Sequence, residues 1–87
     1  MKRFSSEQEV KEFLLGEFYL YSTRSEVINK WLNINKVEHS DKVNDVIYAS
    51  IKAGADGIIQ KKWLIKFVLA KDDTLAEIFV NQGFIGT

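Results

Sequence analysis

Residues 58–70, IIQKKWLIKFVLA, decide the fold, because this mostly apolar stretch fits two kinds of structure. As a helix it is apolar nearly all round, and Lys62 and Lys66 mark one narrow polar strip, which is typical of a helix in a core or an oligomer interface. As a strand it has the β-branched and aromatic residues that sheets favour. In a strand, alternate residues would lie on one face, and these are Trp63, Ile65, Phe67 and Leu69. Thirteen residues is long for a strand, so the length favours a helix.

The N-terminal part of the chain carries two alternative helix start signals. Ser6-x-x-Glu9 is a capping box, and Ser5-x-x-Gln8 is an equally good one. Both predict a first helix from residue 5 or 6. Gly16 either follows the end of this helix or lies inside it at a cost of about 1 kcal/mol, and the sequence leaves these alternatives open.

Three further segments carry helix start signals. These signals are Thr23-x-x-Glu26, Ser40 followed by Asp41, and Thr74-x-x-Glu77. Apolar residues follow each signal at helical spacing. Gly54 and Gly83 are suitable end signals for the second and third of these helices. Together with residues 58–70, the chain therefore has five candidate helices.

The fold class predicted from these patterns is all-α: residues 1–87 form one domain, a small bundle of about five short helices. The alternative is an α+β fold with a C-terminal hairpin over residues 63–80. In that alternative, Lys71, Asp72 and Asp73 form the tip of the hairpin.

Composition excludes several classes of protein. The chain has 87 residues, 46% of them hydrophobic, and no Cys. A disulfide framework, a thiolate metal site and a cysteine nucleophile are therefore excluded. Twelve basic and twelve acidic residues give no net charge, which removes the global electrostatic argument for nucleic acid or membrane binding. No long apolar stretch follows the basic N-terminus, so we expect a cytoplasmic protein without a signal peptide or membrane contact.

Nothing in the sequence points to catalysis. The one histidine, His39, is followed by Ser40 and Asp41, but the side chains of adjacent residues diverge and cannot form a triad. Asp72 and Asp73 lack further oxygen ligands at the loop spacing that a cation site needs. We therefore expect no enzymatic activity, no catalytic residue, no metal site and no cofactor.

A lysine-rich apolar segment and an excess of aromatic residues predict a binding surface. Residues 52–71 carry five lysines against one aspartate, whereas residues 7–17 carry four glutamates against one lysine. Exposed apolar surface of this extent is typical of protein–protein contacts and self-association. We expect a protein partner and a homo-oligomer, with a binding surface made by Lys61, Lys62, Lys66, Tyr19 and Tyr21.

An alternative interpretation is a helix-turn-helix-like DNA-binding regulator that uses residues 24–34. The polar residues at the start of this segment are of types that contact bases or phosphates. The DNA-binding residues in this alternative are Arg24, Ser25, Asn29 and Lys30. The turn lacks its usual glycine, and the segment has few basic residues, so the similarity to the motif is weak.

The sequence thus predicts a small non-catalytic regulator or inhibitor that acts by binding another protein. Lys outnumbers Arg by 10 to 2, which fits the AT-rich genome of a low-GC bacterium or a phage. Small charge-balanced chains without a catalytic site include phage proteins that block a host system. A second alternative is an oligomer that sequesters an anionic small molecule through the lysine-rich segment.

Overall fold

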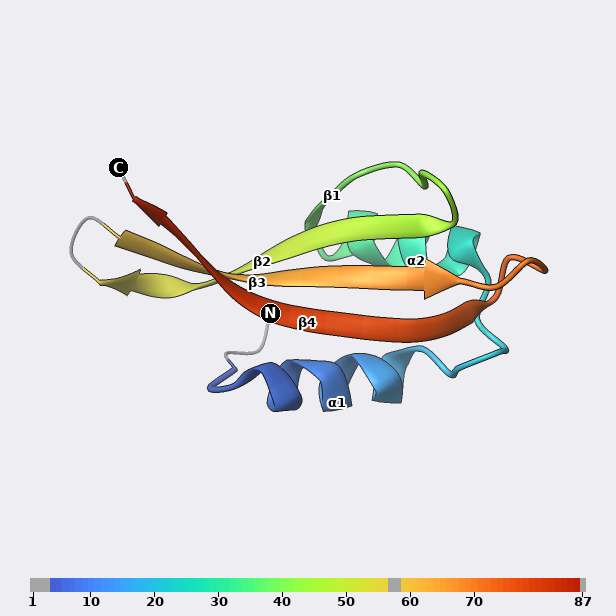
Figure 1. Cartoon of the computed structure of the whole chain (residues 1–87), viewed down its shortest axis with the longest axis horizontal. Helices are drawn as coiled ribbons and strands as arrows, with labels where there is room; N and C mark the ends of the chain where they lie inside the picture. The colour runs from blue at the N-terminus through green and yellow to red at the C-terminus, as the bar shows by residue number, and fades with distance from the viewer. Residues whose placement is uncertain (1–3, 57–58, 87) are drawn as a thin grey trace.

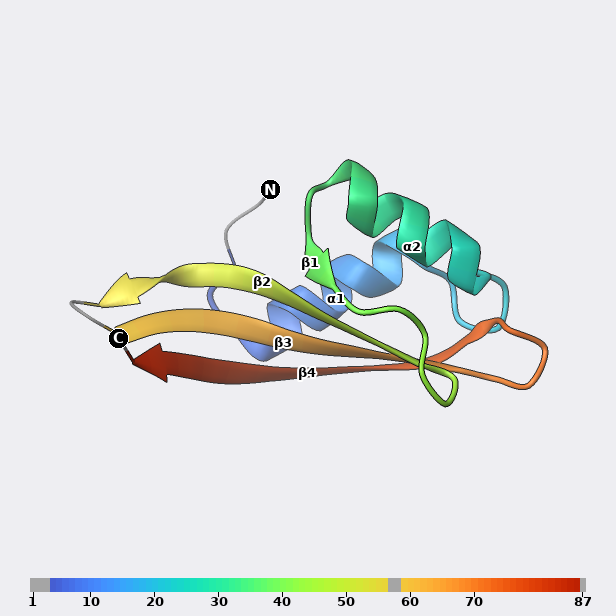
Figure 2. The same ribbon diagram turned by 90° about the horizontal axis from the view of Figure 1, so that it is seen from above.

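Two helices cover one face of a four-stranded antiparallel sheet in the computed structural model, which describes residues 4–56 and 59–86 (Figure 1). The elements are α1 (Glu7–Glu17), α2 (Ser25–Ile34), β1 (Glu38–His39), β2 (Val46–Asp56), β3 (Ile59–Leu69) and β4 (Leu75–Gly86). The strands lie in the order β1-β2-β3-β4, so β3 is paired on both sides. Figure 2 shows both helices on the same side of the sheet.

The predicted all-α bundle of five helices is wrong, because the stretch 58–70 that decides the fold supplies strand β3 and not a helix. Alternate side chains of β3 are buried, and these are Trp63, Ile65, Phe67 and Leu69. Between them lie Leu64, which is exposed, and Lys66, which is half-buried. A strand of this length is stable here because β2 and β4 pair with the backbone of β3 on both sides along its eleven residues.

The helices predicted from Ser40 and from Thr74 are also strands. In β2 the buried residues Ile47, Ala49 and Ile51 alternate with exposed or half-buried ones, which is the period of a strand. Thr74 does not cap a helix, since its hydroxyl donates to Asp72 Oδ1 (2.6 Å) in the turn between β3 and β4. The hairpin of the alternative interpretation is present, and its strands extend further than residues 63–80.

The first predicted helix is confirmed. Ser6 caps α1, and its Oγ accepts a hydrogen bond from the amide of Glu9 (3.2 Å). The helix continues through Gly16 and ends at Glu17. This settles the question that the sequence left open, because a glycine one residue from the helix end costs little.

The second predicted helix is present, but its cap differs. The cap of α2 is Arg24 and not Thr23, and no side chain bonds the first amides. Instead the backbone of the connection pairs with β4: Tyr21 N–H donates to Leu75 O (2.6 Å), and Leu75 N–H donates to Thr23 O (2.7 Å). This pairing fixes the segment between the two helices against the sheet.

A chain of aromatic rings joins the helices to the sheet. The ring centre of Phe4 lies 5.2 Å from that of Phe13 in α1, and the ring centre of Phe13 lies 6.3 Å from that of Trp31 in α2. Trp31 is 5.2 Å from Phe18, which in turn contacts Phe67 of β3 edge to face at 5.7 Å. These are the ring separations at which aromatic pairs attract, so the core lies between the helices and one face of the sheet.

Replacing Phe67 by Ala is expected to lower the free energy of unfolding by about 3–5 kcal/mol, because Phe67 is fully buried and its removal leaves a cavity. The matched control is Phe79→Ala on β4, where the ring is 47% exposed and the expected loss is about 1 kcal/mol or less. Urea denaturation followed by tryptophan fluorescence measures both. Equal losses would contradict the placement of the core on the helix-covered face.

Candidate functional site

The face of the sheet turned away from α1 and α2, which we call the open face, is the candidate site (Figure 1). Strand alternation opposite the buried residues assigns to it Val46, Tyr48, Ser50 and Lys52 of β2, Lys62, Leu64, Lys66 and Val68 of β3, and Glu77, Phe79, Asn81 and Gly83 of β4. Tyr48, Leu64 and Phe79 are 52%, 45% and 47% exposed. Three large apolar side chains therefore gather on three neighbouring strands.

Tyr48, Lys66 and Phe79 form one row across the open face. Lys66 is the register partner of both Tyr48 on β2 and Phe79 on β4. The Lys66 ammonium lies 5.3 Å from the centre of the Phe79 ring, a distance at which the ring attracts a cation. The centre of the open face is therefore both apolar and positively charged.

Lys52 and Lys62 lie directly opposite each other on β2 and β3. Like charges in this position destabilise a sheet. Glu38 of β1 offsets part of this repulsion, since its Oε2 is 3.6 Å from Lys62 Nζ, although the Glu38 side chain is 77% exposed. Within the part of the chain that the structure describes, no carboxylate forms an ion pair with Lys52 or Lys66.

A shallow depression of about 440 Å³ lies between β1 and β3 on the same side. Residues that line it include His39, Tyr48 and Leu64. Next to it, Leu64 lies close to β4, because a Cβ at Gly83 would be only 2.8 Å from Leu64 Cδ1. The lack of a side chain at position 83 therefore determines how Leu64 sits on the open face.

The outer edge of β4 is protected by carboxylates. Gln82 N–H donates to Glu7 Oε2 of α1 (2.8 Å), and Ile78 N–H donates to Glu77 Oε1 (3.1 Å). Lys11 of α1 is 3.8 Å from the same Glu77 oxygen. Occupied amides prevent another strand from pairing with this edge.

The outer edge of β2 is protected in a different way. Strand β1 pairs with Ala49 and Ser50, and Ser40 N–H donates to Tyr48 O (2.8 Å). Beyond these residues, the register shifts between Lys52 and Gly54, and such a bulge interrupts the regular ladder that an added strand needs. The open face, not an edge, is thus the accessible part of the sheet.

The structure brings together only part of the predicted protein-binding set. Lys62 and Lys66 both lie on the open face, whereas Lys61 is adjacent to Lys62 and is therefore directed to the opposite face. Tyr19 and Tyr21 are well exposed, but they lie in the connection between α1 and α2, beside the start of β4.

Sequence reasoning did not select Tyr48, Leu64, Phe79 or Lys52 as binding residues. The alternation of residues 46–52 with a period of two is the signal for Tyr48 and Lys52, and the strand alternation within residues 58–70 is the signal for Leu64. Phe79 follows only from the register of β4 with β3. Once β2 and β4 are recognised as partners of β3, the register places these side chains around Lys66.

The residues of the DNA-binding alternative do not have the arrangement that a helix-turn-helix motif requires. Ser25 is buried, and its hydroxyl donates to Asp73 Oδ2 (2.5 Å), so it is engaged within the fold. Asn29 is half-buried, while Arg24 and Lys30 are exposed. Residues 18–24 separate the helices and pair with β4, whereas the turn of a helix-turn-helix is about 3–4 residues long.

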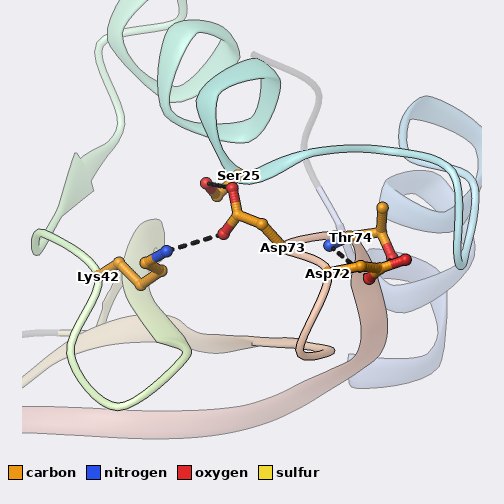
Figure 3. A network of polar contacts seen from close by, with 5 residues as sticks. All are labelled: Ser25, Lys42, Asp72, Asp73 and Thr74. Atoms are coloured by element: carbon orange, nitrogen blue, oxygen red, sulfur yellow. Dashed lines mark hydrogen bonds and ion pairs between the residues drawn. The ribbon is translucent and has the colours of Figure 1, made fainter.

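The acidic pair of the hairpin turn has a structural role (Figure 3). Lys42 Nζ lies 2.8 Å from Asp73 Oδ1, and Ser25 Oγ donates to the other oxygen of the same carboxylate. The hydrogen bond from Lys42, together with that from Ser25, holds the pKa of Asp73 below its ordinary value. Hydrogen bonds from the hydroxyl and amide of Thr74 lower the pKa of Asp72.

The other candidates for chemistry are also engaged in the fold. His39 Nδ1 is 2.8 Å from the carbonyl oxygen of Val37, and Ser40 Oγ accepts from the amide of Tyr48 (3.2 Å). Over residues 4–56 and 59–86, the acidic and histidine side chains form no cluster suited to a metal ion. No helix in these ranges has the length and apolar character needed to cross a membrane.

Comparisons with models of known protein families, with curated proteins and with solved structures found no match. The function is therefore inferred from the chemistry of the open face.

Acid is expected to weaken the fold partly through Asp73. Its pKa is lower in the folded chain, so its stabilising contribution is present above the unfolded pKa of about 3.9 and is lost as the pH falls through the folded pKa. Asp73→Asn should therefore lose less stability than the wild type between about pH 5 and pH 2. Urea denaturation across this range measures the difference, and parallel pH profiles would refute the role of Asp73.

Removing the repulsion between Lys52 and Lys62 is expected to stabilise the sheet. Lys52→Glu should raise the free energy of unfolding by about 0.2–1 kcal/mol, and salt should reduce this gain by screening. Lys30→Glu on α2 is the control and should be slightly destabilising, since Glu26 lies one turn before Lys30. Urea denaturation at low and high sodium chloride tests both variants. An unchanged or lower stability of the Lys52 variant would show that the repulsion is not significant.

Proposed function

We propose that this chain is a non-catalytic binding protein of the cytoplasm that regulates or inhibits another protein through the open face. One observation carries the proposal: Tyr48, Leu64 and Phe79 are about half exposed on adjacent strands. Contiguous apolar surface of this kind is characteristic of interaction sites, and aromatic residues are enriched where proteins meet.

The surroundings of this apolar group support binding to a specific partner. Lys52, Lys62 and Lys66 surround it on β2 and β3, while Ser50 and Asn81 add hydrogen-bonding groups. An apolar centre with a polar and charged margin is the usual anatomy of a protein interface. We assign these groups to recognition and attribute no reaction to them.

The proposal is tested by placing a photo-crosslinking amino acid at position 64 in the chain produced in its native host. We expect a crosslinked protein that survives nuclease treatment, because Leu64 lies at the centre of the open face. The matched control position is Val27 on α2, which is similarly exposed (50% against 45%) but lies on the helix side.

The partner identified in this way is then purified and titrated with variants of the full chain. Leu64→Asp should weaken binding at least on the order of a hundredfold, as expected for a central apolar contact that becomes a buried charge. Val27→Asp should bind like the wild type. Equal crosslinking at positions 27 and 64, or full binding by the Leu64 variant, would disprove the role of the open face.

A further inference from the structure

We propose that the occupant of the open face is an acidic amphipathic α-helix of a different protein. This inference rests on the proposed function and specifies the kind of partner. Four features of the described residues support it: the width of the apolar group, the protection of the sheet edges, the lysines without an ion pair, and the burial of the apolar side of the chain's own acidic helix.

The width of the apolar group fits one helix. Tyr48 and Phe79 lie on the two sides of Lys66 in a single row across three strands. Strands are about 4.8 Å apart, so β2 and β4 are separated by about 10 Å, which is also the approximate diameter of a helix. Leu64 belongs to the adjacent row of the open face, so a helix laid along β3 contacts all three apolar side chains.

The protected edges exclude the other common mode of peptide recognition, in which an extended segment joins a sheet. The amides of Ile78 and Gln82 on β4 already donate to carboxylates. On the other side, β1 covers part of β2, and a bulge follows Lys52. A partner element must therefore lie on the face and satisfy its own backbone hydrogen bonds, as a helix does.

The charge of the open face selects an acidic helix. Lys52 and Lys62 repel each other across the strands, and Lys66 has a ring but no carboxylate beside it among the described residues. Covering these ammonium groups with an uncharged or basic surface would remove their water without providing an opposite charge. Aspartate or glutamate residues flanking the apolar stripe of the helix supply that charge and orient the partner.

The occupant is not a second copy of this chain. Two open faces packed against each other would bring the lysines of both copies together. The acidic helix α1 is not a suitable occupant either, because its apolar residues Val10 and Leu14 are fully buried in its own core.

The open face is also better suited to a protein than to nucleic acid. The chain has no net charge, and Glu38 and Glu77 lie at opposite margins of the three strands that form the face. No arginine is among the residues assigned to the open face, although arginine is the main partner of bases and phosphates in specific complexes. Nucleic acid is therefore kept as an outcome of the test.

The test uses two synthetic amphipathic peptides of about 18 residues with the same leucine stripe. One peptide has glutamates beside the stripe and the other has lysines. Each is titrated into the isotope-labelled full chain, and amide shifts are followed by nuclear magnetic resonance. We expect the acidic peptide to bind about tenfold more tightly, with shifts concentrated on the strands around Leu64, Lys66 and Phe79.

A charge-reversed chain provides the decisive comparison. The double variant Lys52→Glu/Lys66→Glu should bind the lysine peptide more tightly than the glutamate peptide, whereas Lys30→Glu on α2 should keep the wild-type preference. The same spectra report whether each variant is folded. Lys52→Glu alone, which relieves a repulsion, should weaken binding of the acidic peptide in a folded chain.

Three outcomes would overturn the inference: no preference for the acidic peptide, shifts confined to α1 and α2, or tighter binding of a thymidine oligonucleotide of about 15 nucleotides. If the crosslinked partner still depends on Leu64 in those cases, the proposed function stands and only the acidic helix is rejected. If the dependence on Leu64 is also absent, the proposed function fails as well.

Discussion

Pairing of strand β3 on both sides is the constraint on which the rest of this structure depends. Because β2 and β4 take up its backbone hydrogen bonds, β3 stays extended and its side chains alternate strictly. Phe67 is directed into the aromatic chain that holds both helices, while Leu64 and Lys66 are directed to the open face. The core and the candidate site are thus two sides of one strand, and the same alternation creates both.

The two helices of this fold could be predicted from local signals, whereas of the sheet only the hairpin of β3 and β4 could be predicted, and only as an alternative. The Ser6 capping box lies within four residues and specifies α1 directly. Strand β3 depends on partners up to 27 residues away, as in the pairing of Ile59 with Gly86, and a single sequence contains no record of such pairings. The four-residue spacing of Lys62 and Lys66 also satisfies a helix and a strand equally well, so periodicity could not separate them.

Only the part of the candidate site whose residues are close together in the sequence could be predicted. The lysines of residues 58–70 stood out as a cluster, and two of the three selected, Lys62 and Lys66, lie on the open face. Tyr48 and Phe79 belong to other segments, and only the register of the sheet brings them to Lys66. Tyr19 and Tyr21 were selected for their apolar surroundings, and exposure without a shared face does not place them at the same site.

The close approach of Leu64 to Gly83 bears on the selectivity of the proposed interaction. Position 83 supports Leu64 from the neighbouring strand, and a methyl group there would meet the end of a flexible side chain, not backbone. Substitutions at position 83 can therefore shift the Leu64 side chain and change the shape of the open face, while the core on the other face of the sheet stays intact. In the proposed interaction, such substitutions would change the fit to a partner without requiring changes in the core.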